Sequence, residues 1–462
     1  MPTNRLPSLI RYAILMIAFL TSARMNGQSF KLMRFDEDNA YLKDSSRNLY
    51  REIKYTRLSK RDSSYVSFGG SARLEYVDFN NEDWGRRGIG HNGFLLQRYD
   101  VHADLHLNDR FRIFAQIRSA WETGRKTGPR PIDEDRLNVQ NLFLDAAIIR
   151  KKDQALLLRL GRQELDYGSG RLISVREGPN LRLYFDGVKL MYSTRNWTID
   201  GIVMMGDTSF PGGLDNKMSK EINLWGVYSK MTVPTLPNID LYYIGIRRDK
   251  SVFEEGSQNE LRHTVGTRVW KYQSGFTYNL EAAWQFGSFG NGNINAWTTS
   301  VEAGYLFQHI KGKPSLNLRN DYISGDRKRG DGDLQSFNPI YPKGGYFGFS
   351  PQIGPVNLID IHPYATIHIG KKILAGADVV MNWRYSTQDG LYRPGGTFNL
   401  PGSVSLKKYI GTGYLASIVY SMNNFVSLNC GLQYFRVGAF IKDVVPSPKD
   451  GVFFNTRLSF KF

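Results

Sequence analysis

Apolar and polar side chains alternate along most of the chain, and residues 94–122 show the pattern clearly. Arg98, Asp100 and Asp104 share one parity, whereas Tyr99 and Leu105 share the other. Because successive side chains of a β-strand point to opposite faces, this pattern predicts strands with one polar and one apolar face. Two environments fit such strands: a soluble sheet packed on a core, or a membrane barrel with lipid outside and water inside.

Alternation of this kind predicts eighteen strands, separated by connections that are in turn short and long. The strands are expected near residues 65–77, 94–107, 110–122, 137–149, 155–165, 183–193, 196–205, 220–231, 238–248, 260–271, 274–288, 293–308, 314–324, 356–370, 371–385, 408–421, 424–438 and 451–462. Long loops are expected at 79–92, 123–135, 166–182, 206–219, 249–259, 325–355, 386–407 and 439–450, and the one near 288–292 is short. This regular alternation favours an all-β fold, a transmembrane antiparallel up-and-down barrel of about 18 strands in a single chain.

The first residues have the layout of a secretory signal peptide. Arg5 and Arg11 precede the apolar run "YAILMIAFL" and then small residues, which predicts a signal peptide at 1–28 that is cleaved between Ala23 and Gln28. The apolar run is much shorter than the roughly 20 residues of a membrane helix. Residues 29–62 are charged without a clear period and are expected to form a periplasmic lead-in, with the barrel at 63–462 in the Gram-negative cell outer membrane.

The balance of charge points to an anionic partner. The formal net charge is +17, and it stays positive when segment 1–28 is removed. A basic surface attracts polysaccharide, lipid headgroups or small acids, while an exported chain rarely meets nucleic acid, so no nucleic-acid partner is expected. The single Cys430 cannot form an internal disulfide. No zinc-ligand spacing or phosphate-binding glycine loop is present, and we expect no cofactor and no metal.

Charged side chains are expected to face the lumen, because each one on a lipid-facing midplane costs about 2–4 kcal/mol. Arg and Lys rings are a means by which pores select anions. The basic candidates are Arg73, Arg98, Arg112, Arg118, Lys189, Arg262, Arg268, Arg319, Arg384 and Arg457. The acidic candidates that interleave with them are Asp100, Asp104, Asp145, Glu281, Glu302 and Asp321. A generic barrel interior, in which the ion pairs satisfy one another, is the competing interpretation.

The stretch "GRQELDYGSGRLISVREGPNLRLYFDGVKL" resembles the signature of the alginate export family of outer-membrane barrels. The matching residues are Gly161, Arg162, Gln163, Glu164, Leu165, Tyr167, Gly168, Arg171, Leu172, Arg182, Phe185, Asp186, Gly187 and Leu190. The blocks "RHTVGTRVW", "YNLEAAWQFG", "YISGDRKRGDGDLQSFNPIYP" and "NWRYSTQDGLYRPGG" are also similar to family blocks. Together these blocks extend the resemblance over about residues 65 to 462.

The resemblance implies a monomeric eighteen-stranded barrel with an electropositive constriction through which an acidic polysaccharide, typified by alginate, leaves the periplasm by passive diffusion. It further implies that the channel is lined by Arg162, Glu164, Asp186, Arg262, Arg268, Glu281 and Arg384. Three leucines share the face of Arg162, and a bulge would reconcile that parity with a lumen position. Near 409–415 the family tends to carry acids, whereas this chain reads "YIGTGYL", so other anionic solutes stay open.

Other functions are compatible with the same barrel. They are a general porin for small anionic solutes, an adhesin or assembly scaffold, and an enzyme that uses His102, Asp104 and His106 on one strand face. Alternating strand positions point one way by geometry, so a shared face alone is weak evidence for catalysis. We therefore expect a channel and no enzyme, with outer-membrane lipid and a periplasmic export protein as partners.

Overall fold

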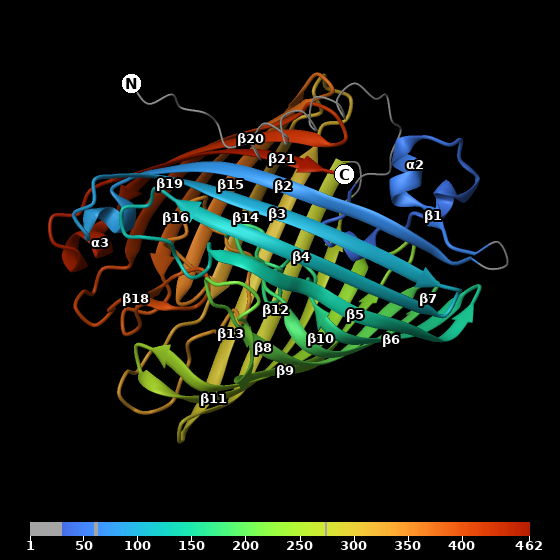
Figure 1. Ribbon diagram of the computed structural model, residues 1–462. Helices are drawn as coiled ribbons and strands as arrows, with labels where there is room; N and C mark the ends of the chain where they lie inside the picture. Colours follow the sequence, from blue (N-terminus) through green and yellow to red (C-terminus); the bar gives the residue numbers. More distant parts are fainter. Residues whose placement is uncertain (1–29, 60–62, 273–274) are drawn as a thin grey trace.

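The computed structural model describes residues 30–59, 63–272 and 275–462, which form a closed antiparallel barrel of 18 strands (Figure 1). The barrel strands are β2 (Tyr65–Asn80), β3 (His91–Leu107), β4 (Phe111–Thr123), β5 (Asp135–Lys151), β6 (Gln154–Gln163), β7 (Phe185–Thr194), β8 (Trp197–Thr208), β9 (Lys217–Met231), β10 (Asn238–Phe253), β11 (Gly256–Lys271), β12 (Gly275–Phe289), β13 (Gly292–Leu306), β14 (Ser315–Ile323), β15 (Leu358–Ile369), β16 (Ile373–Arg384), β19 (Tyr409–Ser421), β20 (Val426–Val437) and β21 (Gly451–Lys461). The predicted fold class is confirmed.

Each strand pairs with its sequence neighbour, and the last strand pairs with the first. The closing pair β2–β21 runs from Ser71 opposite Lys461 to Asn80 opposite Val452. One predicted connection is wrong: the loop expected at 249–259 is a tight turn at 254–255, because β10 continues to Phe253 and β11 begins at Gly256. The buried Phe253 side chain packs against Phe289 of β12 at the end of this hairpin, which favours the continued strand.

The two faces of the strands differ in exposure as the alternation predicts. Val101 and Ile117 are 54% and 48% exposed, whereas the neighbouring Asp100 and Arg118 are 5% and 1% exposed. The apolar face therefore points outward and the charged face points into the barrel. In the described part of the chain, no helix is long and apolar enough to cross a membrane.

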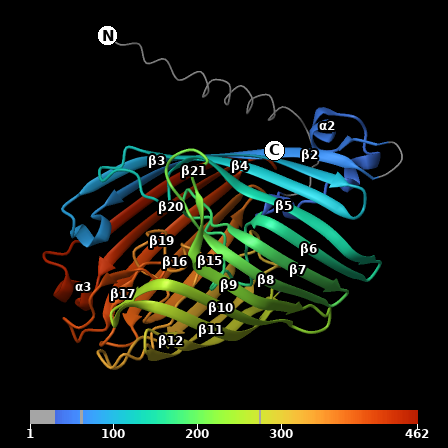
Figure 2. The same ribbon diagram turned by 60° about the horizontal axis from the view of Figure 1, so that its bottom comes forward.

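The two ends of the barrel are different (Figures 1 and 2). One end, called the turn end here, carries short connections such as those between β3 and β4 and between β5 and β6, the last residue Phe462 and the lead-in, which contains η1 (Arg34–Asp36), η2 (Ala40–Asp44), α2 (Leu49–Lys54) and β1 (Thr56–Arg57). The opposite end, called the loop end, has the long loops and also two tight turns, at 254–255 and 290–291. It carries η3 (Glu82–Gly85), β17 (Leu391–Tyr392), β18 (Phe398–Leu400) and α3 (Ala439–Val444). The predicted signal peptide lies outside the described residues.

The lead-in is fixed to the strands that close the barrel. Arg34 Nη2 and Lys54 Nζ donate to the carbonyl oxygen of Phe462 at 2.8 and 3.0 Å, and Arg34 Nη1 donates to Gly70 O at 2.9 Å. Phe35 packs against Phe114 on the inside of the barrel. Two buried cations thus hold the end of β21 against β2.

We predict that Arg34→Ala combined with Lys54→Ala weakens the barrel by about 2–4 kcal/mol, since hydrogen bonds that involve a charged group contribute roughly 1.5–3 kcal/mol each. The measurement is the urea concentration at which half of the protein is unfolded, with the folded fraction read from the heat-dependent shift in gel mobility. Arg47→Ala, at an exposed lead-in position, is the control and should leave the midpoint unchanged. An unchanged midpoint in the double variant would show that the lead-in only rests on the barrel.

Candidate functional site: the charged lumen and the loop that crosses it

The inner wall of the barrel carries arginines paired with carboxylates on adjacent strands. Arg112 Nε lies 2.7 Å from Asp104, and Arg118 Nε lies 2.7 Å from Asp100, its direct cross-strand partner. Further inward pairs are Arg112–Asp145 (3.6 Å), Lys189–Asp200 (2.8 Å), Arg268–Asp240 (3.1 Å), Arg319–Asp321 (3.4 Å) and Arg457–Glu75 (2.8 Å). Four of these seven pairs join directly opposite positions of neighbouring strands, two are diagonal, and Arg319–Asp321 lies along one strand, so much of the fixed charge is compensated.

The remaining inward acids join the same networks. Glu281 lies opposite Arg268 on the neighbouring strand and accepts from Ser169 Oγ at 2.6 Å. Glu302 accepts hydrogen bonds from Asn279 and Tyr364. These acids therefore hold neighbouring polar groups in place and lower the net positive charge of the wall.

Two predicted lining residues are enclosed instead of facing open space. Arg262 is 0% exposed and pairs with Glu260 and Gln285 beneath the loop that carries Ser336. Arg384 is also 0% exposed. Its guanidinium donates to the backbone carbonyls of Thr387, Asp389, Gly402, Ser405 and Lys407. Arg384 thus organises its own loop, because it satisfies carbonyls that no strand pairs.

Arg162 and Asp186 lie on the outer face of the barrel, which corrects the expectation that they line the channel. They are direct cross-strand partners, and Leu142, the partner of Arg162 on β5, is 49% exposed. Their carboxylate and guanidinium form a pair at 2.8 Å. The β6–β7 register is unbroken, and the one irregularity of the β5–β6 pair adds a residue to β5 between Ala147 and Ile149. No extra residue in β6 therefore turns Arg162 inward, and it keeps the parity of the three leucines.

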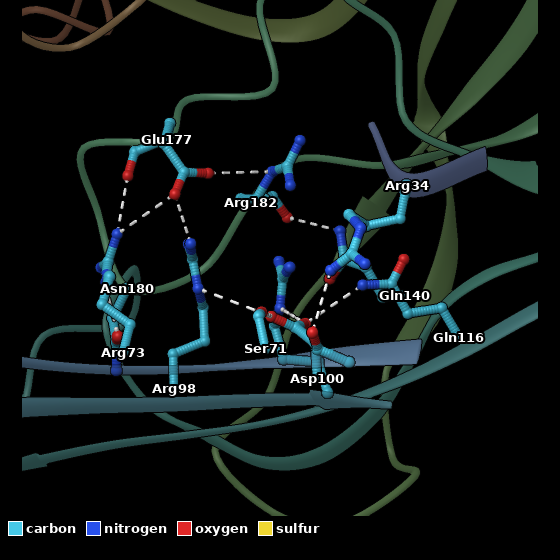
Figure 3. Close-up of polar contacts among 12 residues, drawn as sticks. Arg34, Ser71, Arg73, Arg98, Asp100, Gln116, Gln140, Glu177, Asn180 and Arg182 are labelled. Atoms are coloured by element: carbon cyan, nitrogen blue, oxygen red, sulfur yellow. Dashed lines mark hydrogen bonds and ion pairs between the residues drawn. The ribbon is translucent and has the colours of Figure 1, made fainter. Parts of the chain in front are cut away.

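The connection between β6 and β7, residues 164–184, folds into the barrel and is called the crossing loop here. At one end, Glu177 meets Arg73 of β2 and Arg98 of β3, and the Arg182 Nε of the loop itself lies 3.2 Å from the Glu177 carboxylate (Figure 3). At the other end, Arg171 lies 2.7 Å from Asp321 of β14. Because β2 and β14 are on different sides of the barrel, ion pairs tie the loop to both sides of the bore.

Burial and nearby charges decide the state of Glu177. Partial burial alone would raise the pKa of the Glu177 carboxyl, but Arg98, Arg182 and Arg73 outweigh it and hold the pKa well below its usual range. The predicted lining residue Glu164 is buried at the base of the same loop, 3.2 Å from Arg182 and 3.9 Å from Arg118. Carboxylates and guanidiniums therefore alternate across the loop.

A second inner loop, residues 324–357, packs against the crossing loop. Ser174 N donates to Tyr341 O at 2.9 Å and Tyr341 N donates to Leu172 O at 2.8 Å, which makes a short parallel bridge. Apolar side chains from both loops, such as Ile173 and Phe337, belong to one buried cluster.

Two cavities lie beside the crossing loop. The larger has a volume of about 580 Å³ and is lined by Met33 and Phe35 of the lead-in and by strands β6–β11. The smaller, about 240 Å³, is lined by Glu177, Gly178 and Lys343, and both cavities reach Asp166. Charged residues around the larger cavity are of both signs: Arg159, Lys189, Lys230 and Arg268 against Asp36, Glu164, Asp166, Asp200 and Asp240. Space for water therefore flanks the crossing loop within a mixed electrostatic lining.

Several central residues lie in loops, where alternation along a strand makes no prediction. Glu177 and Lys343 belong to segments where no strand period assigns a direction to a side chain. Burial, with Arg319 and Arg171 nearby, lowers the pKa of Lys343 to about 8. Arg171 and Arg182 stood within the family-like block, and that block was the only sequence signal for them.

The chain resembles one protein family and several solved structures. A family model described as alginate export matches residues 64–455. No curated protein matches the chain.

Among solved structures, OccAB1 of Acinetobacter baumannii is similar with a TM-score of 0.59 and 13% identity over 89% of this chain and 99% of that chain. A BenF-like porin from Pseudomonas fluorescens Pf-5 has a TM-score of 0.57 and 10% identity over 86% of this chain and 98% of that chain. OccD3 (OpdP) of Pseudomonas aeruginosa has a TM-score of 0.57 and 11% identity over 89% of this chain and 93% of that chain. These likenesses show a shared barrel fold.

Proposed function

We propose that this chain, which belongs to the alginate export family and forms an outer-membrane channel, lets an acidic polysaccharide or oligosaccharide cross the membrane by passive, anion-selective diffusion. The observation that carries the proposal is the convergence of Arg73, Arg98 and Arg182 on one carboxylate beside an open cavity. A guanidinium group can bind a carboxylate through two parallel hydrogen bonds. Each sugar unit of a polyuronate carries one carboxylate.

The compensating acids are consistent with transport. A channel must bind its solute strongly enough to admit it and weakly enough to release it. The arginine cluster at the crossing loop contains Arg73, Arg98, Arg118, Arg182 and Arg457 against Glu75, Asp100, Glu164 and Glu177. With all groups ionised, the cluster keeps one positive charge in excess, which favours anions without trapping them.

The parts of the chain have separate roles in this proposal. Residues 1–28 act as the signal peptide, residues 29–62 as a periplasmic lead-in, and residues 63–462 as the barrel in outer-membrane lipid. The channel works as a monomer and receives its polymer from a periplasmic export partner. The turn end then faces the periplasm, which agrees with short turns on that side of outer-membrane barrels.

A channel for small anionic solutes is the second candidate, and the crossing loop favours it because ion pairs fix that loop on both sides of the bore. An enzymatic role has little support. The Asp104 carboxylate is engaged by Arg112 at 2.7 Å, and His102 stacks on Phe114. A scaffold role leaves the cavities and the inward arginines without a purpose.

Proteoliposome swelling distinguishes the two candidates. We expect galacturonate to enter faster than galactose at equal osmolarity, because the arginine cluster attracts the carboxylate. A trigalacturonate that enters with a similar preference over neutral maltotriose supports the polymer channel. Exclusion of trigalacturonate with entry of galacturonate supports the small-solute channel, and equal entry of galacturonate and galactose would contradict anion selectivity in both.

Removal of one lumen arginine should lower the selectivity. We predict that Arg98→Ala reduces the chloride-to-potassium permeability ratio in planar bilayers by about twofold or more, since it removes a fixed positive charge from the inner wall beside the crossing loop. Arg162→Ala, on the outer face, is the matched control and should keep the wild-type reversal potential. An equal reversal potential in Arg98→Ala and wild type would remove this arginine from the selectivity filter.

A further inference from the structure

The Glu177 side chain has the position that a bound solute carboxylate would take. One carboxylate oxygen lies 3.6 Å from Arg73 Nη1 and also accepts from Arg98 Nη2, and the other lies 3.2 Å from Arg182 Nε. The three guanidiniums come from β2, β3 and the crossing loop (Figure 3). Three arginines thus surround one carboxylate group, and a uronate carboxylate has the same charge and shape.

Glu177 is accessible from the cavity, whereas its arginines are enclosed. The Glu177 side chain is 37% exposed and lines the cavity of about 240 Å³. The side chains of Arg73, Arg98 and Arg182 are 3%, 6% and 6% exposed. The Glu177 side chain lines the cavity and its Oε2 atom is buried against Arg182, so this side chain lies between the cavity and the arginines.

The arginine site has donors to spare. Among the described residues, Arg98 Nη1 and Arg118 Nη1 are buried and have no hydrogen-bond acceptor. Buried guanidinium N–H groups without acceptors are costly, and a second oxygen ligand would remove that cost. These donors are an observation independent of Glu177, and they indicate a site with more capacity than one glutamate fills.

The backbone around Glu177 has hydrogen bonds that do not involve the Glu177 carboxylate. Arg73 Nη1 and Nη2 donate to Glu177 O at 2.8 Å and to Pro179 O at 3.0 Å. Asn180 Nδ2 donates to the carbonyl oxygens of Gln97, Trp121 and Asp133. Rotation of the Glu177 side chain into the cavity would free Arg98 Nη2 and Arg182 Nε for a solute carboxylate, while Arg73 continues to hold the backbone of the crossing loop.

We propose that Arg73, Arg98 and Arg182 form a carboxylate-binding site of the pore, and that Glu177 is a built-in competing ligand that an acidic solute displaces. This inference rests on the proposed anion channel and names the site where the solute binds. Because the internal carboxylate competes for the same donors, it lowers the affinity for the solute and speeds its release. Glu177 is thus a specificity-determining residue that sets how long an anion stays in the pore.

The test is the block of chloride current by galacturonate in planar bilayers that contain the full-length channel. We expect Glu177→Gln to lower the half-blocking galacturonate concentration about tenfold, because it removes a competing charge-assisted contact while it keeps the size of the side chain. Galactose should not block either channel. Glu221→Gln, at an exposed position on β9, is the matched control, and its half-blocking galacturonate concentration should equal that of the wild type.

A second variant keeps the test decisive if Glu177→Gln fails to fold. Glu177→Asp retains the charge but shortens the reach to the arginines, and it should lower the half-blocking concentration by a smaller factor. When Arg98→Ala is combined with Glu177→Gln or Glu177→Asp, the half-blocking galacturonate concentration should no longer fall below that of the wild type.

The outcomes separate the two proposals. An unchanged or higher half-blocking concentration in a folded Glu177 variant, in a channel that still prefers chloride, overturns the displaced-ligand model alone. A wild-type channel without any preference for anions overturns the proposed function as well.

Discussion

Closure of the sheet is the constraint on which the rest of the structure depends. A strand in hydrocarbon has no water to satisfy its backbone N–H and C=O groups, so a sheet with a free edge cannot stay in a membrane. Here the pairing of β21 with β2 removes the last edge, and Arg34 and Lys54 of the lead-in hold the end of β21 in place. Once the sheet is closed, the alternation of side chains places every second residue inside the barrel. Charged side chains are favoured at these inner positions because they are costly in lipid.

The charges inside the barrel then need partners. Pairs such as Arg118 with Asp100 satisfy one another across adjacent strands, and the crossing loop supplies Arg171 and Glu177 to partners on different sides of the bore. This arrangement fixes a loop in the lumen without a separate folded plug. It also explains how an interior rich in arginine can be compensated by carboxylates and still gather three guanidiniums around one carboxylate at the crossing loop.

The strands and their faces could be predicted from the sequence because period-2 alternation follows directly from strand geometry. Leu158, Leu160 and Arg162 share one strand face, which indicates that Arg162 points outward. The resemblance to the family block implied the opposite. The strand continued past Arg248 because Phe253 packs on Phe289, a contact distant in sequence that local charge obscures. Glu177 and the enclosure of Arg384 were beyond prediction, because loops have no period and their contacts come from other parts of the chain.

The central claim is that a water-filled, anion-attracting space borders the crossing loop, and chemical accessibility tests it most directly. In a Cys430→Ser background, Gly178→Cys places a thiol at the exposed tip of the loop, where residue 178 lines the smaller cavity. The account predicts that a sulfonate-bearing thiol reagent modifies this cysteine in reconstituted channels about threefold or more faster than a trimethylammonium reagent of similar size, since local positive potential concentrates anions. Faster reaction with the trimethylammonium reagent, or no reaction with either, would contradict the account.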